Sequence, residues 1–275
     1  MNDLLSALSA AHFGVFTVRD AYDCGYHRQS LSQLVRSGQA LRVGPSAYVD
    51  RAHYEAASPE RRHEMATRAA VRTFDGRVYA SHYSVLTLMS LPVFGALLDH
   101  IHVARASDSR SRRRPGLSIH SAYGAGAGLL IGRTPSVNPA LAILGAAMTC
   151  GIETGVVAAD AALATGKTTV DDLQIWLGRL SRHRDVTHAR QAVRLADARS
   201  ESVGESRTRL LLNAIGFRPT SQFEIRDGHG RLVGRVDFLL ERERIIVEFD
   251  GLMLHSCKTS RRRHGARGVG RREVA

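Results

Sequence analysis

Two apolar segments near the C-terminal end of the sequence carry acidic residues where strands are expected. Asp237 lies within VDFLL, and Glu248 and Asp250 lie within and directly after RIIVEF. An unpaired carboxylate costs several kcal/mol to bury, so acids in such runs indicate a bound cation. Cross-strand neighbours lie about 5 Å apart, a separation that suits two ligands of one Mg²⁺. The sequence therefore predicts that Asp237 and Glu248 hold magnesium.

These acids need a small α/β framework to bring them together. The pattern predicts a helix beginning near Gly204, with Glu205 in its first turn, followed by strands over SQFEIRD, LVGRVDFLL and RIIVEFD. Four apolar residues are expected to form the buried stripe of that helix: Leu210, Leu211, Ala214 and Ile215. Magnesium at such a site can activate water and neutralise charge on a phosphodiester, so hydrolysis of DNA is the reaction expected.

The order of these acids is similar to that of a nuclease superfamily. Glu205, Asp237 and the pair Glu248 and Asp250, in the strings GESRTRLLL, GRVDF and VEFDG, resemble the Vsr-like branch of the PD-(D/E)xK endonucleases. The resemblance implies a restriction-endonuclease-like α/β core over 201–256, with Glu205 as the helix acid and Asp237 and Glu248 as metal ligands. Asp250 stands where the family has lysine, and His255 is the candidate to assist the water instead.

The last residues, 257–275, have a composition of their own. Seven basic residues face one acid there, which accounts for half of the net charge of +12, and no apolar periodicity is present. One interpretation is a C-terminus truncated and altered by a frameshift, because the family continues with an amphipathic helix. The other is a disordered arm that binds nucleic acid by counterion release. Both predict a disordered tail.

Residues 1–52 predict three helices followed by a hairpin. Leu31, Leu34 and Val35 repeat at helical spacing and Gly38 ends the helix, while 41–48, with Pro45 at its bend, form the hairpin. Polar side chains then face outward, and we expect six of them to contact DNA: Arg28, Gln29, Ser32, Gln33, Arg36 and Arg42. The alternative is an ordinary polar helix surface; the hairpin favours DNA binding.

The strings FTVRDA, CG, SLSQLVRSG and LRVGPSAYV over 12–50 resemble the N-terminal winged helix-turn-helix of AbiEi-type antitoxins of type IV toxin–antitoxin systems. This resemblance implies binding to double-stranded DNA, repression of the protein's own operon, and a nucleotidyltransferase toxin as partner. The following segment, 53–200, is similar to the AbiEi middle region and predicts a helix-rich α/β domain with a few strands.

Several features of the middle segment are interpreted as structural. His100 and His102 are expected on one strand face with His82 and His120 elsewhere, so no metal-ligand set is predicted. GKTT at 166–169 lacks the glycine of a phosphate loop and is expected to join two helices. The arginines in 110–114 are expected in a solvated loop.

At 275 residues and 44% hydrophobic composition, the chain is long enough for two or three domains. We expect no signal peptide and no membrane span, because the longest apolar run, 139–151, fits a buried helix. Cys24, Cys150 and Cys257 have no metal or redox spacing, which favours the cytoplasm.

The predicted fold class is α+β multidomain: a winged helix-turn-helix (1–52), a helix-rich α/β middle domain (53–200) and a truncated endonuclease-like core (201–256) before the tail. Two functions remain open. The first is a DNA-binding protein with a Mg²⁺-dependent endonuclease-like domain, and the second is a non-enzymatic AbiEi-like antitoxin and autorepressor. The sequence leaves the DNA site and the oligomeric state undetermined.

Overall fold

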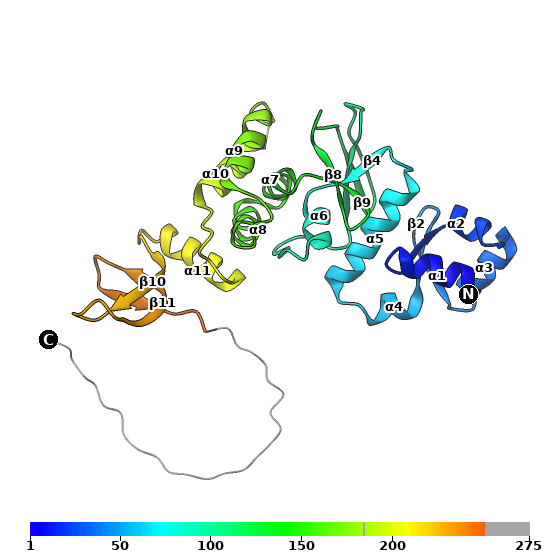
Figure 1. The fold of residues 1–275 in the computed structure, drawn as a ribbon. Coiled ribbons are helices and arrows are strands. Elements are labelled where there is room, and N and C mark those ends of the chain that lie inside the picture. The colour runs from blue at the N-terminus through cyan, green and yellow to red at the C-terminus, as the bar shows by residue number, and fades with distance from the viewer. Residues whose placement is uncertain (184, 251–275) are drawn as a thin grey trace, which may run out of the picture.

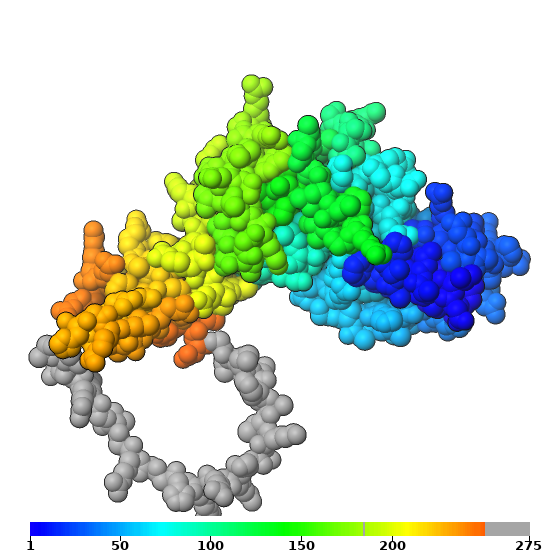
Figure 2. All heavy atoms as spheres, in the orientation of Figure 1, coloured from blue at the N-terminus to red at the C-terminus, as the bar shows by residue number. Residues whose placement is uncertain are grey.

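A computed structural model describes residues 1–183 and 185–250 of the chain. These residues form eleven helices and twelve strands, and the strands make three separate sheets. The molecule is elongated, with the first sheet at one end, the largest sheet and its helices in the middle, and the third sheet at the other end (Figures 1 and 2). The fold is therefore of mixed α and β type, as predicted.

The N-terminal unit contains the three helices and the hairpin that the sequence predicts. Its elements are α1 (Asp3–Ala11), β1 (Val15–Thr17), α2 (Val18–Asp23), α3 (Arg28–Arg36), β2 (Ala40–Gly44) and β3 (Ala47–Asp50). Strand β1 was not predicted; it pairs antiparallel with β3, and Val15 faces Val49. The resulting sheet has the order β1-β3-β2.

Local sequence explains where these helices begin and end. Thr17 and Asp20 form a capping box at the start of α2, in which each side chain accepts a hydrogen bond from the other's backbone N–H. Leu31 and Leu34 are buried on the inner face of α3. Gly38, just beyond the end of α3, has a φ of 77°, a conformation that glycine adopts without strain.

Helix α5 (Pro59–Thr73) follows the short α4 (Arg51–Ala56) and packs on two sheets. Met65 and Ala69 of α5 join Val15 and Val49 in one apolar cluster, so this helix covers the face of the small sheet opposite α1 to α3. The same helix packs against α6 and β5 of the middle unit. It is therefore shared by the two units.

Arg68, on α5, is buried at this join. Its guanidinium donates hydrogen bonds to Glu64 Oε1 at 2.7 and 3.0 Å and to Gly132 O at 2.9 Å, and it lies 3.8 Å from the centre of the Phe13 ring. One side chain thus contacts α5, the β8–β9 hairpin and the segment between α1 and β1.

The middle unit has more strands than predicted. It contains β4 (Val78–Ala80), α6 (Tyr83–Leu88), β5 (Ile101–Arg105), β6 (Arg112–Arg114), β7 (Leu117–His120), β8 (Gly128–Ile131) and β9 (Thr134–Val137), and the sheet order is β6-β7-β5-β4-β9-β8. Three of the arginines expected in a loop, Arg112–Arg114, instead form the exposed edge strand β6, where charge discourages pairing with another chain.

Four helices follow the sheet along the chain: α7 (Pro139–Cys150), α8 (Ile152–Ala164), α9 (Val170–Arg179) and α10 (Val186–Leu195). They pack mainly against one another, and α7 also packs against α6. The apolar run predicted as a buried helix is α7, with nine buried residues, and GKTT lies between α8 and α9 as predicted. In the described ranges, no helix combines the length and apolar character needed to cross a bilayer.

The C-terminal unit is the predicted helix and meander: α11 (Val203–Ala214), β10 (Thr220–Arg226), β11 (Leu232–Leu240) and β12 (Ile245–Val247). The three strands form a sheet in the order β10-β11-β12. The predicted buried stripe of α11 was wrong, because Leu211 and Ile215 are each 62% exposed. The face that α11 buries instead carries Glu205, Ser206, Arg209 and Leu212.

A buried ion pair explains that unexpected face. Arg209 Nη2 lies 2.6 Å from Asp160 Oδ2 of α8, and Ser206 donates a hydrogen bond to the same oxygen at 2.6 Å. Burial raises the pKa of Asp160, although the charge of Arg209 and the surrounding hydrogen bonds oppose this effect. Polar bonding therefore attaches α11 to the middle unit where apolar packing was expected.

This attachment gives a stability prediction. Replacing Arg209 by methionine leaves the carboxylate of Asp160 buried without its cation, so we expect the free energy of unfolding to fall by about 3–5 kcal/mol. The matched control is Arg235→Met, which removes an ion pair with Glu201 whose side chains are 51% and 55% exposed; it should change stability by about 0–1 kcal/mol. Urea unfolding of both variants measures the difference, and equal losses would contradict the prediction.

Candidate functional site

All six residues predicted to contact DNA are exposed. Arg28, Ser32 and Arg36 follow one another at four-residue spacing along α3, and Gln29 and Gln33 lie beside them. Arg42 is on β2, the first strand of the hairpin that follows. Because Leu31 and Leu34 hold the opposite side of α3 in the core, the polar side is fixed toward solvent.

The segment that contains α3 and most of the following hairpin carries charge of a single sign. Residues 28–49 contain Arg28, Arg36 and Arg42 and no acid. In the described part of the chain, the side chains of Arg28 and Arg36 take part in no ion pair, and Arg42 donates only to the nearby Gly44 carbonyl at 3.2 Å. Three unpaired guanidinium groups on one helix and the adjoining strand form a surface suited to phosphate and base contacts.

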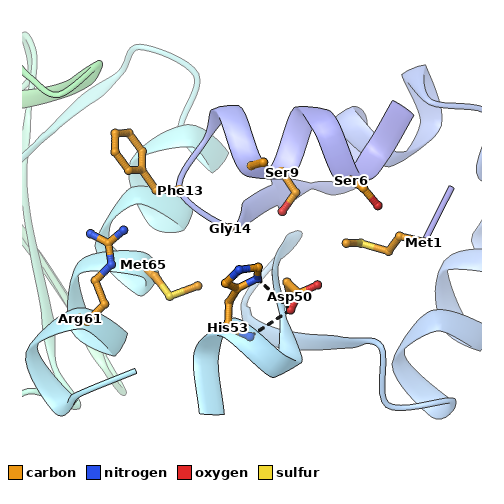
Figure 3. A pocket seen from close by; sticks show the side chains of 10 residues that line it. Met1, Ser6, Ser9, Phe13, Gly14, Asp50, His53, Arg61 and Met65 are labelled. Atoms are coloured by element: carbon orange, nitrogen blue, oxygen red, sulfur yellow. Dashed lines mark hydrogen bonds and ion pairs between the residues drawn. The ribbon is translucent and has the colours of Figure 1, made fainter. Parts of the chain in front are cut away.

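A hollow of about 390 Å³ lies elsewhere on the N-terminal unit, between α1, α4 and α5 (Figure 3). In it, His53 Nδ1 lies 3.2 Å from Asp50 Oδ1, and Arg61 and Met65 line the wall. None of the residues predicted to contact DNA or metal lines this hollow. It therefore adds no residue to the predicted sites.

The structure brings Asp237 and Glu248 together as predicted. In the β11–β12 register, Phe238 faces Val247, so Asp237 lies opposite Glu248, one residue beyond the end of β12. The side chains, however, bind the backbone: Asp237 Oδ2 accepts a hydrogen bond from Phe249 N at 2.7 Å, and Glu248 Oε2 lies 3.5 Å from Asp237 N. The two carboxylates are neighbours on a half-exposed to exposed strand pair.

The other acids predicted for this site do not converge on the pair. Glu205 Oε2 accepts hydrogen bonds from Glu201 N at 2.8 Å and from Gln222 Nε2 at 2.9 Å, so its carboxylate links α11 to the preceding turn and to β10. Asp250 is exposed. His255 lies outside the described residues. Within 1–183 and 185–250, the carboxylates form no group of three ligands that could hold a metal ion.

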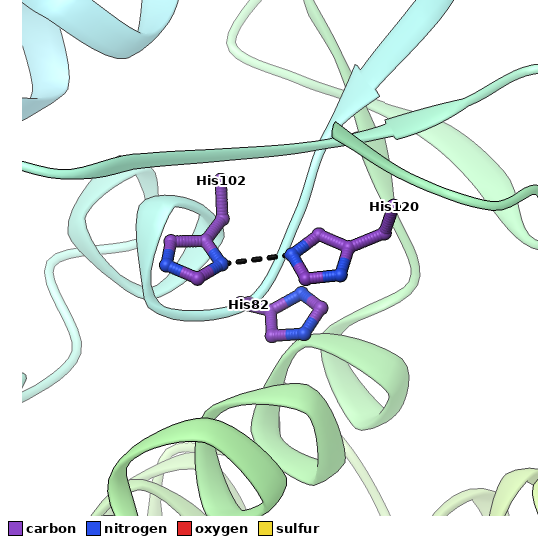
Figure 4. A group of neighbouring side chains, drawn as sticks. All are labelled: His82, His102 and His120. Atoms are coloured by element: carbon purple, nitrogen blue, oxygen red, sulfur yellow. Dashed lines mark hydrogen bonds between the residues drawn. The ribbon is translucent and has the colours of Figure 1, made fainter. Parts of the chain in front are cut away.

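A histidine cluster was missed by the sequence analysis. His82, His102 and His120 place one ring nitrogen each within 4.8 Å of the others (Figure 4), which corrects the expectation that His82 and His120 lie elsewhere. Burial lowers the pKa of His102 to about 2 and that of His120 to about 4, and holds the pKa of His82 well below its usual value. The available signal was weak: His102 and His120 lie in segments expected to be strands, whereas His82 lies in a segment expected to be a helix.

Comparison with known proteins gives a match at the N-terminus. Residues 3–49, which comprise α1, α2, α3 and the hairpin, match the family AbiEi_4, described as "Transcriptional regulator, AbiEi antitoxin". The matched range contains all six residues predicted to contact DNA. The N-terminal unit is thus similar to that of AbiEi antitoxins.

Two relatives from Mycobacterium tuberculosis are similar over most of the chain. "Uncharacterized protein MT2308" of strain CDC 1551 / Oshkosh and "Uncharacterized protein Rv2248" of strain H37Rv are each 26% identical over 232 residues. The alignment covers 83% of this chain and 80% of each relative, so the likeness extends well beyond the N-terminal unit.

The exposed side of α3 should be dispensable for folding. Because the side chains of Arg28 and Arg36 face solvent, we expect the double variant Arg28→Ala, Arg36→Ala to change the free energy of unfolding by less than about 0.5 kcal/mol. Leu34→Ala, on the buried side of the same helix, should cost about 2–5 kcal/mol. Thermal unfolding compares the two variants, and a large loss in the arginine variant would assign these side chains a structural role.

Proposed function

We propose that the protein is a DNA-binding transcriptional regulator of the AbiEi-antitoxin type. In this proposal α1 to α3 with the β2–β3 hairpin form a winged helix-turn-helix, and α3 is the recognition helix. One observation carries the proposal. Six exposed polar residues, none of them acidic, lie on the segment that matches the antitoxin family.

The positions along α3 suggest a division of roles. In helix-turn-helix proteins the N-terminal part of the recognition helix contacts base edges in the major groove. Arg28, Gln29, Ser32 and Gln33 occupy that part of α3, and arginine and glutamine are suited to bidentate contacts with guanine and adenine. Arg36 at the end of α3 and Arg42 on the hairpin would bind backbone phosphates.

The family likeness also supports a biological setting. A regulator of this type would bind double-stranded DNA upstream of its own operon and repress it. A nucleotidyltransferase toxin encoded beside it would be its protein partner. Regulation of this kind needs binding but no chemistry, and the exposed arginine, glutamine and serine side chains of α3 are of the kind that bind DNA.

The α3 proposal is tested by DNA binding. We expect Arg28→Ala with Arg36→Ala to weaken binding to the promoter fragment of the protein's own operon, because each specific arginine contact contributes about 1–3 kcal/mol. The dependence of log affinity on log salt should also become shallower by about one for each phosphate that the variant no longer binds. Fluorescence anisotropy at several salt concentrations measures both quantities.

A matched control separates the contribution of the α3 arginines to DNA affinity from the effect of the protein's net charge. Arg190 and Arg194 are exposed, four residues apart on α10, so Arg190→Ala with Arg194→Ala removes the same charge from another helix. This control should leave specific affinity nearly unchanged. Equal effects of the two double variants would show that net charge, and not α3, determines binding.

A second candidate function is Mg²⁺-dependent hydrolysis of DNA, which is favoured by one observation: Asp237 and Glu248 face each other across β11 and the end of β12. In this proposal both residues bind Mg²⁺, while Glu205, Asp250 and His255 would assist. The position of Asp237 and Glu248 weakens this second proposal, because the third sheet lies at the opposite end of the molecule from α3, the helix proposed to bind DNA (Figure 1).

Cleavage assays distinguish the two functions. If the second candidate is correct, the chain will cut plasmid or mismatched duplex DNA in the presence of Mg²⁺, and Glu248→Ala will abolish cutting. Glu243→Ala, which removes another exposed acid from the turn before β12, should then cut normally. DNA binding without any cutting by the unmodified chain would eliminate the nuclease and leave the regulator.

A further inference from the structure

The middle unit gathers three imidazole rings from separate segments. His82 directly precedes α6, His102 is in β5, and His120 ends the neighbouring parallel strand β7. His102 Nδ1 lies 2.9 Å from His120 Nε2, and the rings of His82 and His120 stack with their centres 3.8 Å apart. Figure 4 shows the three rings facing one another above α7.

Among residues 1–183 and 185–250, no acid is found to account for the grouping of these rings. His82 Nδ1 lies 2.7 Å from Ser81 Oγ. The groups whose charge influences the three rings most are one another, His63, His100, His183 and Arg113, all of them basic. An imidazole binds a metal ion through the lone pair of an unprotonated ring nitrogen.

Two backbone features hold His82 in the cluster. Its φ of 53° and ψ of −144° are unusual for a residue with a side chain. On α7, a Cβ at position 145 would lie 2.8 Å from the His82 ring, so Gly145 is what allows the helix to approach the ring. The strained backbone of His82 and the glycine that gives its ring room on α7 together indicate that the surrounding structure maintains the position of this ring.

We propose that His82, His102 and His120 bind one Zn²⁺ ion. Zinc accepts imidazole nitrogens at 2.0–2.1 Å in a tetrahedron, which places ligand atoms about 3.3 Å from one another. The three nitrogens lie within 4.8 Å of one another, and His102 Nδ1 lies 2.9 Å from His120 Nε2. The rings of His82 and His120 stack, so the site forms when side-chain rotations turn the three lone pairs toward one point. Water would occupy the fourth position.

The three histidines differ in exposure to solvent, and this difference indicates from which side an ion would reach the site. His82 is 3% and His102 is 4% exposed, whereas His120 is half-buried and provides the route to solvent. A bound ion would join the turn before α6 to the two parallel strands, because each contributes one ligand. Zinc would therefore stabilise the middle unit, since a ligand that binds only the folded state raises its stability.

Zinc binding by the full chain without a polyhistidine tag tests the proposal. After removal of metal with a chelator, calorimetric titration should give one Zn²⁺ per chain. His120→Gln should weaken binding by more than about 100-fold, because groups that only orient metal ligands already change affinity by 10–100-fold. Mg²⁺, which prefers oxygen ligands, should not bind at this site.

Two further measurements keep the result interpretable. The matched control His100→Gln changes a histidine whose ring neighbours His102 but which bonds to Ser118 outside the cluster, and it should keep zinc affinity within about threefold. Co²⁺ should give the visible spectrum of a tetrahedral nitrogen site in the unmodified chain, and this spectrum should be absent in His120→Gln. Absence of zinc binding by the unmodified chain, or unchanged affinity in His120→Gln, would overturn the proposal.

Discussion

The guanidinium of Arg68 is the interaction on which the arrangement of the first two units depends. It is buried, it bonds to Glu64 on its own helix and to the turn between β8 and β9, and it covers the Phe13 ring of the N-terminal unit. An unpaired charge in this position would cost several kcal/mol, so Glu64 and the backbone acceptor must be present together. The polar bonds therefore select one position of the N-terminal unit on α5.

That position leaves the polar side of α3 exposed. Helix α5 covers one face of the sheet β1-β3-β2, and α1 to α3 cover the other, so the only part of α3 that remains outside is the side with Arg28, Ser32 and Arg36. The surface proposed to bind DNA is thus a consequence of how the small sheet is enclosed. It lies at the opposite end of the molecule from the third sheet (Figures 1 and 2).

The sequence predicted features that depend on short spacing. Leu31 and Leu34 located the buried side of α3, and the short apolar runs around Asp237 and Glu248 located two paired strands, because both patterns follow from local geometry. The face of α11 was predicted wrongly because periodicity counts apolar residues only, whereas Arg209 and Asp160 satisfy each other in the interior. The histidine cluster depends on the parallel pairing of β5 with β7, a long-range choice that no short pattern encodes.

The apolar cluster of the C-terminal unit is much smaller than that of the middle unit. The fully buried part of the C-terminal cluster is Leu212, Phe238 and Leu240, and the ion pair of Arg209 with Asp160 attaches α11 to α8. Regions with little buried apolar surface open at a small fraction of the global free energy of unfolding. The backbone amides of β10 and β11 will therefore exchange with solvent deuterium earlier than those of α7 and α8, which makes the C-terminal meander a separate cooperative unit of unfolding.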